Sequence, residues 1–146
     1  MIRLLAVLGL ALGLVTQQAQ ASAATVAVDP GFAPVASALA QMFSAQTGHD
    51  LVLMVAAGPA LEGTAADVLL APDADLPARL AEDGRAAPES LMTYAMGAAG
   101  GDGATRPRDA VLLRDGAQNP VARSFMEFLM TPEAWDVIVS HGFGAH

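Results

Sequence analysis

The chain has 146 residues, a formal net charge of −8 and no cysteine. Such an acidic chain is a poor partner for nucleic acid or for anionic membranes, because both carry charge of the same sign. Without cysteine, no disulfide framework forms, whichever compartment the protein occupies.

The first 23 residues have the pattern of a secretory signal peptide. A short basic head precedes an apolar run at 4–15, and the small residues Ala21 and Ala23 suit a cleavage site. The apolar run is shorter than the roughly 20 residues that a membrane-spanning helix needs. We therefore expect export to the periplasm and a mature chain, 24–146, that does not insert into the membrane. An uncleaved anchor is the alternative.

Strand and helix patterns alternate through the first half of the mature chain. Strands are predicted at 25–29, 51–57 and 66–71, and helices at 30–48, 59–63 and 75–83. The strand at 51–57 is a continuous apolar run, which is typical of a strand buried on both faces of a parallel sheet. The first helix places apolar residues three and four apart, at Phe32, Val35, Leu39, Met42 and Phe43. Alternation of this kind predicts a small three-layer α/β fold with mainly parallel strands and helices on both faces.

The second half contains two predicted strands, at 91–96 and 109–114, on either side of a Gly-rich stretch. Two helices follow, opened by Asn119-Pro120 and by Thr131-Pro132. Each opening pairs a capping side chain with a proline at the first helical position.

Two stretches resemble the periplasmic molybdate-binding proteins of ABC transporters. One is "TVAVDPGFAPVASALAQMFSAQTGHDLVLMV" with the later "ADVLLAPD", and the other is "DAVLLRDGAQNPVARSFMEFLMTPEAWDVIVSHGFG". The resemblance implies one lobe of a type II periplasmic binding protein, a family in which two α/β lobes, joined by two crossing strands, hold the ligand between them. The family's chains are much longer, and the shortfall lies between Tyr94 and Asp109. Residues 97–108 therefore look like a Gly-rich bridge that replaces the second lobe. An ordinary hairpin loop in an unrelated fold is the alternative.

The resemblance also locates a ligand site, which this sequence has altered. In the family, serine hydroxyls and backbone N–H groups at two helix N-termini hold the oxyanion, and such termini suit anions. The first loop reads "VDPGF" in place of "AASSL", and the second reads "AAGP" in place of "GSSG". Each loop has lost its hydroxyls and gained a proline, which removes a backbone donor. The remaining donors are the amides of Gly31, Ala57 and Gly58, which we expect to bind ligand together with Asp29 and Asp73.

Asp29 has two interpretations. Asp29-Pro30 is a good helix start, so capping is its expected role. Its charge would also repel an anion, since a dianion about 4 Å from a carboxylate meets roughly 8 kcal/mol of repulsion at an effective dielectric constant of about 20, whereas a helix terminus contributes about 0.3–2 kcal/mol. Alternatively, Asp29 and Asp73 follow neighbouring strands at the ligand-binding edge of the sheet, where two carboxylates would favour a cation.

The other chemistry-bearing residues give weaker patterns. The histidines at 49, 141 and 146 lack ligand spacing, whereas Met54, Met92 and Met96 could form a thioether site for Cu(I), although methionine on apolar runs usually fills the core. Arg106-Pro107-Arg108 is the only basic cluster, suited to an acidic partner or to keeping a loop soluble. No serine has a convincing His/Asp partner pattern, so no enzymatic activity and no cofactor are predicted.

The sequence thus predicts an exported, non-enzymatic solute-binding-type protein with a degenerate oxyanion site. Metal-cation handling, of copper for example, or a protein-interaction module on the same scaffold is the alternative. The predicted partners are a small oxyanion or a metal cation, and an ABC permease or a second copy that covers the exposed cleft face, because a half-cleft buries less of a ligand than a closed site.

Overall fold

The computed structural model describes residues 23–98 and 105–144. Its elements, in chain order, are β1 (Ala23–Val28), α1 (Ala33–Thr47), β2 (Asp50–Val55), α2 (Pro59–Glu62), β3 (Val68–Leu70), α3 (Asp75–Glu82), a 3-10 turn (Pro88–Ser90), β4 (Met92–Ala98), β5 (Thr105–Leu112), a second 3-10 turn (Gly116–Gln118), α4 (Pro120–Phe128) and α5 (Pro132–Ser140).

The five described strands form one sheet in the order β2-β1-β3-β5-β4. β1 pairs in parallel with β2 and β3, and β5 pairs antiparallel with both β3 and β4. Four strands therefore point one way and β5 points the other, which confirms the predicted α/β sheet of mainly parallel strands.

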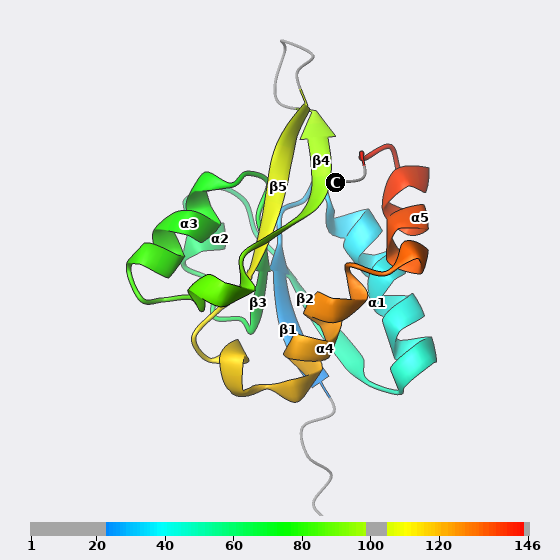
Figure 1. Ribbon diagram of the computed structural model, residues 1–146, viewed down its shortest axis with the longest axis horizontal. Helices are drawn as coiled ribbons and strands as arrows, with labels where there is room; N and C mark the ends of the chain where they lie inside the picture. The colour runs from blue at the N-terminus through cyan, green and yellow to red at the C-terminus, as the bar shows by residue number, and fades with distance from the viewer. Residues whose placement is uncertain (1–22, 99–104, 145–146) are drawn as a thin grey trace, which may run out of the picture.

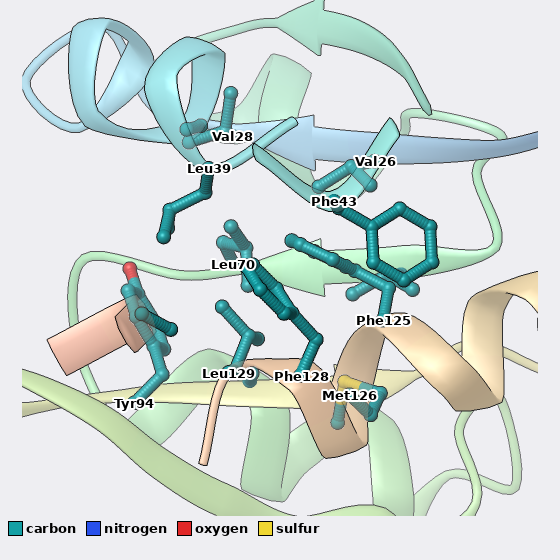
Figure 2. Packing of buried hydrophobic residues seen from close by; sticks show 14 of the residues in the cluster. Val26, Val28, Leu39, Phe43, Leu70, Tyr94, Phe125, Met126, Phe128 and Leu129 are labelled. Atoms are coloured by element: carbon teal, nitrogen blue, oxygen red, sulfur yellow. The ribbon is translucent and has the colours of Figure 1, made fainter. Parts of the chain in front are cut away.

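Helices cover both faces of this sheet (Figure 1). α1, α4 and α5 bury one cluster of side chains against one face, and α2 and α3 bury a smaller cluster against the other. In the larger cluster, the rings of Phe43 and Phe125 meet edge to face with their centroids 5.6 Å apart, close to Val26 and Leu70 of the sheet (Figure 2). The three layers expected from the sequence are confirmed.

The start of α1 differs from the prediction. The helix begins at Ala33, three residues after Pro30, and the carboxylate of Asp29 does not cap it. Instead, the carbonyl oxygen of Asp29 accepts hydrogen bonds from the amides of Phe32 and Ala33, at 3.2 and 3.1 Å, which makes a turn before the helix. The predicted end is confirmed, since Gly48 terminates α1 with a φ of 75°.

The prediction that residues 51–57 form a strand buried on both faces is wrong. β2 lies at the edge of the sheet, and its side chains at Val52 and Val55 are 53% and 54% exposed. Only the side chains that face α1, Leu51 and Leu53, are partly buried. A continuous apolar run therefore did not distinguish a central strand from an edge strand.

β4 and β5 extend into the stretch expected to be a bridge. They form an antiparallel hairpin in which Gly97 lies opposite Arg106, with a register irregularity between Thr93 and Ala95. Residues 99–104 of the expected bridge lie outside the described residues. Whether 97–108 replaces a second lobe therefore stays a prediction.

The two C-terminal helices begin where the sequence predicts. The side-chain oxygen of Asn119 accepts a hydrogen bond from the amide of Val121 at 3.0 Å, and that of Thr131 accepts one from Ala134 at 3.3 Å. The amide group of Asn119 also donates to the Ala23 carbonyl and to Asp67, at 3.0 and 3.2 Å, which ties α4 to the sheet. Across the described parts of the chain, no helix has both the length and the apolar character needed to cross a membrane.

Candidate functional site

The predicted ligand-binding residues come together at one end of the sheet. Val28, the last residue of β1, lies level with Val55 of β2 and with Leu70 of β3, so the loops that follow these three parallel strands begin side by side. Asp29 and Gly31 lie in the first loop, Ala57 and Gly58 in the second, and Asp73 in the third. In open α/β sheets, ligands bind beyond the carboxyl ends of the strands, which is where these loops lie.

The carboxylate of Asp29 is held by an internal cation. Oδ1 of Asp29 forms an ion pair with Nη2 of Arg108, a residue of β5 that lies 79 positions further along the chain. Both side chains are largely buried, at 14% exposure for Asp29 and 9% for Arg108. The Asp29 carboxylate, which was expected to cap α1, thus forms a buried ion pair instead, because it turns toward the guanidinium rather than toward the amides of α1.

Arg108 is fixed by further contacts around its guanidinium. Nε donates a hydrogen bond to the hydroxyl oxygen of Tyr94 at 3.1 Å, and that hydroxyl donates to the Ala71 carbonyl at 2.8 Å. The guanidinium carbon also lies 5.3 Å from the ring centroid of Phe32 and 5.2 Å from that of Phe143, within the range of cation–π attraction. The expectation that Arg108 forms part of an exposed basic cluster is therefore wrong.

Tyr94 supports this arrangement as a neutral donor. Its side chain is fully buried, and burial raises the pKa of its phenol above the ordinary value, although the nearby Arg108 acts in the opposite direction. A protonated hydroxyl can donate to Ala71 and accept from Arg108 at the same time. The chain of contacts runs from the end of β3 through Tyr94 and Arg108 to Asp29.

Gly97 makes room for the arginine. A Cβ atom on Gly97 would lie 2.9 Å from Cδ of Arg108, closer than side chains pack. The arginine can therefore lie across β4 only where β4 has no side chain.

Sequence reasoning missed Arg108 as a partner of Asp29, because Arg108 fell in a stretch expected to be a loop. Gly97, the penultimate residue of β4, is a signal that could have indicated it.

The three amides predicted as anion donors lie in the loops at this end of the sheet. Among the described residues, none accepts a hydrogen bond from the amides of Gly31, Ala57 or Gly58. All three residues are exposed, and Gly58 adopts a φ of 56° that favours glycine. The amide of Ala56, by contrast, donates to the Val28 carbonyl at 3.0 Å within the sheet.

Asp73 serves a different part of the site from Asp29. Its Oδ1 accepts a hydrogen bond from the amide of Leu76 at 3.0 Å, so the carboxylate stabilises the first turn of α3. Gly58, Asp73 and Arg79 are among the residues that line a shallow pocket of about 260 Å³, and Asp29 and Gly31 do not line it. The structure therefore separates the predicted site into the Asp29–Arg108 pair and a small pocket between the second and third loops.

The prediction of a thioether metal site formed by Met54, Met92 and Met96 is wrong. Met54 lies on β2, whereas Met92 and Met96 lie on β4, and the sheet order places these strands at opposite edges. Within residues 23–98 and 105–144, no group of three or more His, Asp or Glu side chains is placed to hold a metal ion.

Comparison with known proteins gives likeness in structure but not in sequence. No protein-family model and no curated protein matches the sequence. Among solved structures, a periplasmic molybdate-binding protein from Azotobacter vinelandii aligns with a TM-score of 0.72 at 15% identity, over 84% of this chain and 99% of that chain. A substrate-binding domain attributed to a molybdenum ABC transporter of Clostridium difficile aligns with a TM-score of 0.74 at 7% identity, over 85% and 99% of the two chains. PEB3 in complex with L-phospholactate aligns with a TM-score of 0.64 at 8% identity, over 84% and 99%. These likenesses show the fold, which matches one lobe of a periplasmic binding protein.

Proposed function

We propose that the protein is an exported, non-enzymatic solute-binding-type protein whose oxyanion site has become an internal ion pair. The fold of molybdate-binding proteins supports the solute-binding class. The observation that carries the proposal is the ion pair between Arg108 and Asp29. Asp29 lies in the first of the two loops where the family resemblance places the ligand.

The ion pair leaves little at the first loop to attract a free anion. The positive charge of Arg108 is already matched by Asp29, and its Nε is used by Tyr94. Pro30 offers no amide, so Gly31 is the one donor of the three surviving amides that remains in this loop. An oxyanion would therefore have to displace the Asp29 carboxylate before it reached the guanidinium.

The remaining pocket is shallow and open to solvent, so a ligand held there by this chain alone would stay largely exposed, whereas ligand sites usually bury most of the ligand surface. A partner that covers the cleft end would complete it. An ABC permease or a second copy of the chain is the proposed partner at this end, as the resemblance to transport receptors implies. No feature of the described residues favours the metal-handling alternative.

Calorimetric titration with molybdate and tungstate tests the proposal. We expect the purified protein to bind neither oxyanion tightly. Asp29→Ser frees the guanidinium of Arg108 and restores a hydroxyl to the first loop, so it should increase oxyanion affinity by about tenfold or more, equivalent to roughly 1.4 kcal/mol.

Asp73→Ser is the matched control for this titration. It removes the same charge from the same end of the sheet but leaves the ion pair in place. If the two variants gain affinity equally, the effect is one of net charge and the role of the ion pair is refuted. Tight binding of molybdate by the unaltered protein would also refute it.

Export is tested by cell fractionation. The proposal requires the protein to accumulate in the periplasm with an N-terminus near Ala24, as read by mass spectrometry. Retention of residues 1–23 in a membrane fraction would instead support the uncleaved anchor.

A further inference from the structure

The surface formed by α1 and β2 carries almost no charge. Between Asp29 and Glu62, the sequence contains one Asp, Glu, Lys or Arg residue, Asp50, although the whole chain has fifteen acidic residues. This segment builds the 15-residue helix α1 and the six-residue strand β2. Depletion of charged residues is the compositional mark of the centre of a protein–protein interface.

The edge of β2 also lacks the features that normally protect an edge strand. It pairs with β1 in an unbroken register from Asp50 to Val55, so no bulge twists it away, and it contains neither Pro nor Lys. Val52, Met54 and Val55 are exposed on it. A strand of this length with free backbone groups and apolar side chains is ready to pair with another strand.

A groove lies beside this edge, between β2 and α1. Its volume is about 540 Å³. It is lined by uncharged residues of α1, by Leu51 and Leu53 of β2, which face α1, and by Asp50 at the start of β2. The groove runs along the open edge, so side chains of an added strand would enter it on the α1 side of the sheet.

We propose that a second copy of this chain pairs with β2 in antiparallel orientation, about a twofold axis near Val52. Directly opposed residues of an antiparallel pair point to the same face. Leu51 and Leu53 of the second copy therefore face the α1 side and fill the groove, and Val52 and Met54 of both copies meet on the other face. The interface is self-complementary, as a twofold dimer requires.

Charge makes the α1–β2 surface the one that a second copy can approach. Two molecules with a net charge of −8 repel each other over most of their surfaces, and the α1–β2 surface brings only one carboxylate from each. With Val52 opposite its own copy, Asp50 lies opposite Met54, and the two Asp50 residues are about 13 Å apart along the strands. That separation exceeds the screening length of about 8 Å at physiological salt. This dimer surface is separate from the cleft end, so its test is independent of the proposed function.

Sedimentation velocity and light scattering test the dimer. Over two decades of concentration up to roughly 100 µM, we expect a monomer–dimer equilibrium that Val52→Lys weakens by at least about tenfold, because a lysine on the edge opposes strand pairing. Val139→Lys is the matched control, since Val139 on α5 is 52% exposed and Val52 is 53% exposed. A wild-type protein that stays monomeric throughout, or a dimer that responds equally to both variants, would overturn the proposal.

Oxidative cross-linking gives a second readout that does not depend on tolerance of a lysine. The chain has no cysteine, so a single introduced thiol can form a disulfide only between copies. Val52→Cys should yield a covalent dimer on a non-reducing gel, and Val139→Cys should not, with circular dichroism confirming that both variants are folded. Equal cross-linking at the two positions would show that collision alone produces the dimer and would refute pairing through β2.

Discussion

Substitution of Arg108 by methionine tests the ion pair at the centre of the site. Methionine keeps an apolar stem among the rings that surround the arginine, but it removes the charge that faces Asp29. The carboxylate would be left without its cation while its side chain is only 14% exposed. The hydroxyl of Tyr94 would also lose the hydrogen bond that it accepts from the guanidinium.

The expected loss of stability is large for a single substitution. Removing one partner of a buried ion pair typically costs about 3–5 kcal/mol, and the partial exposure of Asp29 places this case near the lower end, at about 3 kcal/mol. Arg79→Met provides the comparison, because Arg79 is 58% exposed and its ion pair with Glu62 spans 3.5 Å. Exposed pairs of this kind contribute about 0–1 kcal/mol.

Urea unfolding followed by circular dichroism measures both effects, with an unchanged slope as evidence that the folded states are comparable. Combining Arg108→Met with Asp29→Asn removes the orphaned charge. The double variant should therefore be more stable than the sum of the two single losses implies, by about 2 kcal/mol. The reasoning is refuted if Arg108→Met costs no more than Arg79→Met, or if the two single losses simply add.

Three further predictions concern neighbouring contacts. Tyr94 is the only tyrosine of the chain, and burial raises its pKa. The tyrosine of the unfolded chain therefore ionises first, so stability should fall as the pH rises above about 10, the ordinary pKa of tyrosine. Tyr94→Phe should abolish that fall in urea titrations. Gly97→Ala should cost about 1–3 kcal/mol by crowding the arginine stem, and a loss that persists undiminished in an Arg108→Ala background would contradict this cause. Asn119→Ala should lower the free energy of unfolding by about 1–2 kcal/mol, which is more than the loss expected for Thr131→Ala. The reason is that Asn119 also binds Ala23 and Asp67, whereas the hydrogen bonds of the Thr131 side chain are to residues next to it in the chain. Equal losses would show that capping alone matters.

The sequence predicted the parts of the fold that depend on local signals. Asn119-Pro120 and Thr131-Pro132 start helices because their side chains bond to amides two and three residues away. The alternation of strand and helix is also a local pattern, and it predicted the three layers of the fold. Asp29-Pro30 carries an almost identical signal, yet it starts no helix, because the carboxylate has a stronger partner in Arg108.

The parts that could not be predicted depend on residues far apart in the chain. The partner of Asp29 lies 79 positions away, and nothing in the spacing of either residue indicates the other. The edge position of β2 depends on which strands lie beside β1, a property of the whole sheet rather than of the apolar run itself. The predicted residues of the site do share one end of the sheet, but their division between an ion pair and a small pocket is decided by side-chain packing.

The fit of Arg108 across Gly97 against Asp29 has a consequence for how this sequence can evolve. A side chain at Gly97 would displace the arginine, and loss of the arginine would leave the aspartate without its cation, so a change at one of the three positions favours changes at the others. In diverging descendants of this chain, the three residues should be inherited or replaced together. A lineage with serine at position 29 would hold a buried arginine without its carboxylate, so replacement of the arginine and the glycine should follow.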